Sequence, residues 1–129
     1  MQNRAFYPES IAPPLGHYAH GVEIPPNSKI TFIAGQVGID PDGNIPADFA
    51  SQAENAWNNC MKILAHNGMR MKDVVKVNHF ITDRANLPAY NEVRTKFLGK
   101  DKPASTLLIV AGLALPELMI EVEMVAAKP

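Results

Sequence analysis

The sequence has few of the features that mark secreted, membrane or nucleic-acid-binding proteins. Its 129 residues include one cysteine, Cys60, which cannot form a disulfide within the chain and is expected to fill space in the core. The longest apolar run, around 107–115, is interrupted by Gly112 and is far shorter than the roughly 18 residues of a membrane span. The formal net charge is -1 and the 12 Lys and Arg are scattered, which argues against a nucleic-acid partner.

The N-terminal segment and the motif content narrow the class further. Residues 1–15 contain Pro8, Pro13 and Pro14 where a secretion signal would have an apolar stretch, so we expect a cytoplasmic protein without a membrane partner. No phosphate-binding loop or nucleophile motif is present, and the Gly-Gln-Val-Gly stretch at 35–38 is too short to hold a phosphate. We therefore expect no nucleotide cofactor. The length of the chain predicts a single domain over 1–129.

Hydrophobic periodicity predicts two helices. Apolar residues recur at helical spacing over 49–66, and Asp48 directly before them is a favourable N-cap. A second amphipathic pattern begins at Leu87 and stops at Gly99, a residue type that commonly ends helices. These two helices are long enough to cover one face of a small sheet.

The remaining β-rich segments predict one sheet. Together with the helices they indicate an α+β fold, in which both helices pack on the same face of a mixed sheet. The first two strands would form a hairpin around a Pro-Pro-Asn-Ser turn. The strands are expected at 17–24, 29–37, 74–82, 106–111 and 119–127.

The other face of this sheet is also apolar. Strand 106–111 is apolar on both sides, and strand 29–37 places Phe32 on one side and Ile33 on the other. Two helices cannot cover both faces of one sheet. Either the second face is buried against other copies of the chain, or edge loops and the N-terminal arm cover it.

Candidate catalytic and metal-binding groups are few. His17 and His20 are three residues apart, a spacing that directs them to opposite faces of a strand, so no metal site is predicted. His79 lies within a strand and is expected to be structural. Glu121 and Glu123 share one face of the last strand, about 7 Å apart. They are either a solvated acidic face or a pair in which one carboxylate transfers a proton.

Several short motifs follow one another in a characteristic order over nearly the whole chain. They are Gly16-His17-Tyr18-Ala19-His20-Gly21-Val22, Ile33-Ala34-Gly35-Gln36, Asp40-Pro41-Asp42-Gly43, Gln52 with Asn55, Asp73-Val74-Val75-Lys76, Tyr90-Asn91, Pro103-Ala104 and Ile120-Glu121-Val122-Glu123-Met124-Val125-Ala126. Each is weak alone, but together they resemble the Rid family, also called YjgF or liver perchloric-acid-soluble protein. The resemblance implies a chorismate-mutase-like α+β subunit and a homotrimer with ligand clefts between subunits.

The resemblance also implies a chemistry. In the deaminating members of this family, the cleft binds a small 2-imino or 2-enamino acid and an arginine holds its carboxylate. A water near a glutamate adds to the imine carbon and ammonia is released, without any cofactor. Position by position, the resemblance implies Glu121 as the water-positioning glutamate, and Tyr18, Gly35, Asn91, Ser105 and Leu107 as residues of the cleft.

Ser105 departs from the family pattern. It stands where the deaminating members have the arginine, and Leu107 stands where a cysteine is common. A hydroxyl offers a neutral hydrogen bond in place of a bidentate charged contact. The sequence leaves open whether another cation, such as Arg4, Lys100 or Lys102, replaces it.

Two hypotheses from different classes follow. The chain is either a deaminase-type hydrolase of a small imine, enamine or carbonyl metabolite, or a ligand-binding or regulatory protein that keeps the cleft without the chemistry. A third, an endoribonuclease or translation inhibitor, is a label that some relatives carry. The absence of a basic stripe in the sequence disfavours it.

Overall fold

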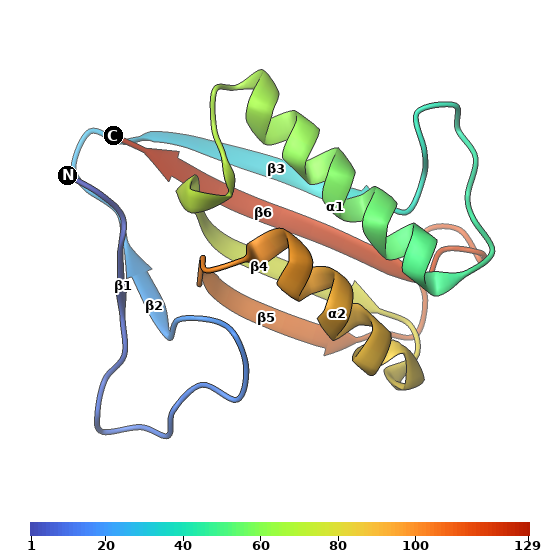
Figure 1. Ribbon diagram of the computed structural model, residues 1–129, viewed down its shortest axis with the longest axis horizontal. Coiled ribbons are helices and arrows are strands. Elements are labelled where there is room, and N and C mark those ends of the chain that lie inside the picture. Colours follow the sequence, from blue (N-terminus) through green and yellow to red (C-terminus); the bar gives the residue numbers. More distant parts are fainter.

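A computed structural model describes all 129 residues and shows a four-stranded mixed sheet with two helices on one face (Figure 1). The strand order is β3-β6-β4-β5, in which β6 is antiparallel to both neighbours and β5 is parallel to β4. The elements of this layer are β3 (Lys29–Val37), α1 (Phe49–His66), β4 (Val74–Ile81), α2 (Leu87–Leu98), β5 (Ala104–Ile109) and β6 (Ile120–Lys128), with short 3₁₀ turns at Met71–Asp73 and Arg84–Asn86. The predicted α+β class and both predicted helices are confirmed.

Helix α1 begins where its capping residue predicts. The Asp48 carboxylate accepts a hydrogen bond of 2.9 Å from the backbone N–H of Ser51, which satisfies one of the free donors of the first turn. This backbone hydrogen bond, together with one from the Ser51 side chain, stabilises the ionised form and lowers the pKa of Asp48. The chain turns away after Asn67 at Gly68, whose φ of 71° is accessible to glycine at little cost.

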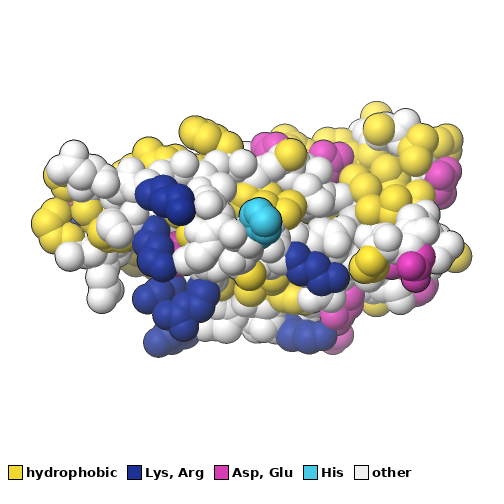
Figure 2. All heavy atoms as spheres, turned by 90° about the horizontal axis from the view of Figure 1, so that it is seen from above, with side chains coloured by type: hydrophobic (Ala, Val, Ile, Leu, Met, Phe, Trp, Pro, Cys, Tyr) yellow, Lys and Arg dark blue, Asp and Glu magenta, His cyan; other side chains and the backbone are white.

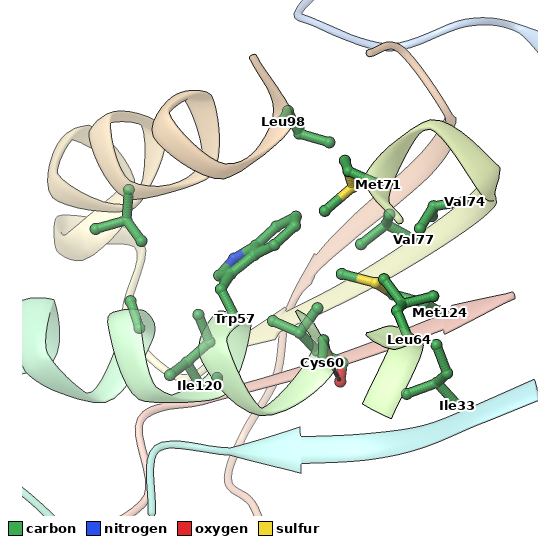
Figure 3. Packing of buried hydrophobic residues seen from close by; sticks show 14 of the residues in the cluster. Ile33, Trp57, Cys60, Leu64, Met71, Val74, Val77, Leu98, Ile120 and Met124 are labelled. Carbon is green, nitrogen blue, oxygen red and sulfur yellow. Dashed lines mark hydrogen bonds between the residues drawn. The ribbon is translucent and has the colours of Figure 1, made fainter. Parts of the chain in front are cut away.

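The core lies between α1, α2 and the covered face of the sheet (Figure 3). Trp57 is fully buried, stacks on Phe97 of α2 with ring centroids 5.6 Å apart, and donates its indole N–H to the Tyr90 hydroxyl at 3.1 Å. Alternate residues of β6, from Ile120 to Ala126, are buried beneath the helices. The helix periodicity and the strand alternation therefore converge on one apolar layer.

The prediction that the first two strands form a hairpin is wrong. Strand β2 (Gly21–Glu23) pairs with β1 (Arg4–Phe6) in a separate two-stranded sheet and does not pair with β3. The Pro-Pro-Asn-Ser segment leads from one sheet into the other, with Asn27 at a φ of 63°. The proline-rich segment before β2 therefore folds back beside the main sheet (Figure 1).

The second face of the main sheet is uncovered within the chain. Phe32 is 80% exposed, and Ile30 and Leu108 are each about half exposed. The alternative in which edge loops and the N-terminal arm cover this face is therefore wrong. An apolar sheet face left open in this way is typical of a surface that contacts another molecule.

Charged side chains are unevenly distributed over the face seen in Figure 2. Lys and Arg gather toward the end that carries the chain termini, while most Asp and Glu lie toward the other end. The scattered positions of these residues in the sequence give no sign of this gathering. Neither helix combines the length and the apolar character that crossing a membrane requires.

Candidate functional site

A cleft of about 410 Å³ lies beside α2 and the edge strand β5. Four of the residues to which the family resemblance gives a cleft role are on its wall. The lining consists of Leu15, Gly16, Tyr18, Leu87, Asn91, Arg94, Ser105 and Leu107. Helix α2, strand β5 and the N-terminal segment thus each contribute one wall.

The N-terminal segment reaches this cleft by adding to the edge of the main sheet. Ala19 forms a parallel bridge with Ala104, and its backbone N–H donates to the Pro103 carbonyl at 3.0 Å. This contact places Tyr18 next to β5, where its hydroxyl accepts a hydrogen bond from the Leu15 N–H at 3.2 Å. A segment that the sequence placed in a hairpin is therefore one wall of the cleft.

Helix α2 contributes a polar wall one turn long. Asn91 and Arg94 are three residues apart, a spacing at which helical side chains are neighbours, and the Arg94 guanidinium donates to the Asn91 side-chain oxygen. The guanidinium also lies over the Tyr90 ring, 5.6 Å from its centroid. Arg94 is half-buried and takes part in neither of the two ion pairs of the chain, which are Arg4–Glu23 and Lys96–Glu54.

Behind Ser105 lies a buried chain of hydrogen bonds. Nε2 of His79 is 2.9 Å from the Ser105 hydroxyl, and Nδ1 of the same ring is hydrogen-bonded to the Tyr90 hydroxyl. The Tyr90 oxygen in turn accepts the Trp57 indole N–H. His79 and Tyr90 are almost fully buried, so this chain connects the core to the cleft and ends at Ser105.

Burial sets the charge of His79. Desolvation disfavours the imidazolium, and the positive charges of Arg94 and Lys76 add to the effect, so the pKa of His79 falls to about 3. The ring is therefore neutral near pH 7 and has one N–H and one acceptor nitrogen. Desolvation likewise raises the pKa of the Tyr90 hydroxyl, which stays protonated.

This neutral histidine predicts a pH-dependent stability. In the unfolded chain His79 binds a proton below about pH 6.5, whereas in the folded chain it binds one only near pH 3. The unfolded state therefore holds more protons between these values. The free energy of unfolding should fall by about 1.4 kcal/mol for each pH unit below 6.5, and it should not change through His79 above that pH. Urea denaturation between about pH 7.5 and 5 measures this slope.

Two variants give the matched comparison. His79→Phe should lose the slope, although it should also lower stability at every pH because Ser105 and Tyr90 lose their partner. His66→Gln, at the exposed end of α1, should keep it. An unchanged slope in His79→Phe would show that another group causes the acid sensitivity.

Glu121 and Gly35 lie on the opposite, open face of the sheet. Glu121 alternates with the buried Ile120 and Val122 of β6, which places its side chain away from the helices. It lies over Gly35, where a β-carbon would come within 1.9 Å of the Glu121 carboxylate. Gly35 sits where the pairing of β3 with β6 is irregular, and any side chain at this position would force the Glu121 carboxylate to move.

The six residues to which the family resemblance gives a role therefore fall into two groups in the structure. Tyr18, Asn91, Ser105 and Leu107 share the cleft on the helix side, and Glu121 meets Gly35 on the open side. Sequence reasoning missed the contribution of Arg94, which carries no motif and enters only because α2 packs beside β5. It also treated His79 as structural without finding its link to Ser105.

The other residues considered for chemistry are engaged elsewhere. A ring nitrogen of His17 is 3.1 Å from the Asp101 carbonyl oxygen, and His20 packs edge-on against Tyr7. Glu123 accepts a hydrogen bond of 3.0 Å from Asn78, so the two acids of β6 have different surroundings. Cys60 lies on the buried face of α1, and desolvation raises the pKa of its thiol to about 12.

The mixed sheet with two helices on one face is an α+β fold of the chorismate-mutase-like, YjgF type. The family model for Endoribonuclease L-PSP matches residues 9–128. The chain belongs to this family, which is the Rid or YjgF family of the sequence resemblance.

Known proteins of this family match over almost the whole chain. The crystal structure of the Rid-family protein YyfB of Yersinia pestis has a TM-score of 0.87 and 30% sequence identity, covering 99% of this chain and 100% of that one. The 3-aminoacrylate deaminase RutC of Acinetobacter baylyi is 28% identical, with 98% of each chain covered. The structure of Escherichia coli TdcF with bound serine has a TM-score of 0.74 and 27% identity, covering 98% and 99%.

Proposed function

We propose that the chain assembles as a homotrimer whose inter-subunit clefts bind a small imine, enamine or carbonyl metabolite and hydrolyse it with a water positioned by Glu121. At the level of the family, relatives with deaminase activity support a role of this type. The serine bound to TdcF supports a ligand of amino-acid size. No cofactor takes part in this reaction.

One observation carries the proposal. The cleft residues Asn91 and Ser105 lie on the helix side of the sheet, whereas Glu121 lies on the open side, so one subunit cannot place them around one small ligand. A neighbouring copy that packs the β5 edge of its sheet on this exposed apolar face would bring its own cleft to the Glu121 of this chain. The same contact would bury Phe32, which is otherwise 80% exposed.

The proposed reaction needs only water and one carboxylate. The Glu121 carboxylate accepts a proton from water while the water oxygen bonds to the imine carbon, and the proton passes to the imine nitrogen. The resulting carbinolamine loses ammonia as its carbon–nitrogen bond breaks and a carbonyl forms. One imine and one water thus give one carbonyl compound and one ammonia.

The assembly is tested by light scattering. We expect a mass three times the 14.1 kDa of the chain at micromolar concentrations. Phe32→Asp should lower the mass toward that of one chain, because a charge cannot be buried against an apolar neighbour without a partner. A single-chain mass for the unmodified protein would exclude the inter-subunit site.

The activity is tested on imines made in solution. An amino-acid oxidase generates 2-imino acids, and the protein should accelerate their decay to the 2-oxo acid above the spontaneous rate. Ser105, in the place of the family's arginine, favours a second candidate, a ligand-binding protein without the chemistry. Binding of a 2-oxo acid without any acceleration of imine decay would identify that function instead.

A further inference from the structure

The buried hydrogen-bond chain behind Ser105 has a direction, which the donors and acceptors determine. The Tyr90 hydroxyl accepts the Trp57 indole N–H and has one proton of its own to donate. Its only other partner is Nδ1 of His79. If that nitrogen carried the proton, the fully buried Tyr90 hydroxyl would have no acceptor for its own proton, which is unfavourable for a buried polar group. Tyr90 therefore donates to Nδ1.

The same direction continues to the cleft. Because Nδ1 accepts, the neutral ring carries its proton on Nε2, which donates to the Ser105 oxygen at 2.9 Å. The Ser105 proton has no acceptor within the chain and faces the cleft. His79 thus cannot act as a base toward Ser105, and Ser105 is a hydrogen-bond donor rather than a nucleophile.

Arg94 supplies a positive charge to the same cleft. Its guanidinium has no carboxylate partner in the chain, and its contacts with Asn91 and the Tyr90 ring hold it at the cleft wall. Of the three cations left open by the sequence, Arg4 is paired with Glu23. Lys100 and Lys102 line a separate hollow together with Asp101.

We propose that Arg94 and the Ser105 hydroxyl form a two-point anchor for the carboxylate of a small ligand, with His79 and Tyr90 as positioning residues for the hydroxyl. The anchor rests on the proposed function, because it assigns the ligand class of the same cleft. Arg94 supplies the charge that Ser105 lacks, from α2 instead of β5. An arginine and a hydroxyl donor are both suited to carboxylate oxygens.

The anchor is tested with two probes that differ only in charge. These are 2-oxobutanoate and its neutral amide, titrated by NMR against the assembled protein. Arg94→Gln should lower the affinity for 2-oxobutanoate by about 10-fold or more and leave the affinity for the amide unchanged, because only the carboxylate loses a charged contact. Ser105→Ala should weaken both probes by about fivefold, because a carbonyl oxygen also accepts from the hydroxyl. Arg84→Gln, an exposed arginine outside the cleft, is the matched control and should change neither.

The positioning role has its own spectroscopic test. Nitrogen-15 NMR of the wild-type imidazole should show His79 protonated at Nε2 and unprotonated at Nδ1. Tyr90→Phe removes the donor to Nδ1, so the proton should shift toward that nitrogen and 2-oxobutanoate should bind more weakly. The opposite tautomer in the wild type would overturn the donor role of Ser105, even if a variant failed to fold.

The outcomes separate the anchor from the proposed function. Equal affinity of 2-oxobutanoate for wild type and Arg94→Gln would overturn the anchor while the cleft remains a binding site. Loss of 2-oxobutanoate binding in Arg94→Gln with full amide binding supports the anchor, whether or not imines are hydrolysed. Failure of both probes to bind the wild-type protein would overturn the small-metabolite cleft itself and the anchor with it.

Discussion

Trp57→Ala is expected to lower the free energy of unfolding by about 3–5 kcal/mol, because it empties the centre of the core. Trp57 is fully buried between α1 and α2 and stacks on Phe97. Its truncation also removes the indole N–H that donates to the fully buried Tyr90 hydroxyl. Urea denaturation at a fixed protein concentration measures the change, since subunit association itself alters apparent stability.

Two further variants separate packing from hydrogen bonding. Trp57→Phe keeps an aromatic ring and removes the N–H, so it should cost less than Trp57→Ala. Asn58→Ala, on the exposed side of α1, should change stability by no more than about 0.5 kcal/mol. A Trp57→Ala variant with the wild-type urea midpoint would mean that α1 presents a different face to the sheet.

Local sequence patterns predicted the helices because their signals are local. Asp48 caps α1, and the apolar spacing that follows is buried as one stripe. The prediction of an N-terminal hairpin was wrong because strand pairing is not a local property. The partner of β2 is β1, which lies across a long proline-rich segment, and no short-range pattern distinguishes this pairing from a turn at the two prolines. Sheet pairing depends on contacts that the whole fold decides.

The candidate site shows the same limit. Family resemblance identified Ser105 and Asn91, which the fold brings to one cleft. Nothing in the sequence marks Arg94, an ordinary charged residue on a helix surface. Its position opposite Ser105 arises from the packing of α2 beside β5, and the link from His79 to Ser105 arises from the parallel pairing of β4 with β5.

The role proposed for Glu121 predicts a large loss of activity from a small change. Glu121→Gln keeps the shape of the side chain over Gly35 but cannot accept a proton from water, so imine hydrolysis should fall by about 100-fold or more. Affinity for 2-oxobutanoate should change little, because binding and proton transfer use different groups. Glu123→Gln is the matched control on the same strand and face, since its carboxylate is engaged by Asn78. Equal rates for Glu121→Gln and wild type would exclude Glu121 as the base.

If the chain assembles as the proposed homotrimer, mixed trimers show which subunits form each cleft. Asn91→Ala removes a cleft residue on the helix side, so homotrimers of this variant and of Glu121→Gln should both be nearly inactive. Suppose that each cleft combines Asn91 of one subunit with Glu121 of its neighbour. After random one-to-one mixing, a cleft is intact only if a Glu121→Gln chain supplies its Asn91 and an Asn91→Ala chain supplies its Glu121. Each of these two conditions is met in half of the clefts, so about a quarter of the wild-type activity should return. If both residues came from one subunit, no mixed trimer would contain an intact cleft, and the mixture would stay as inactive as its parents.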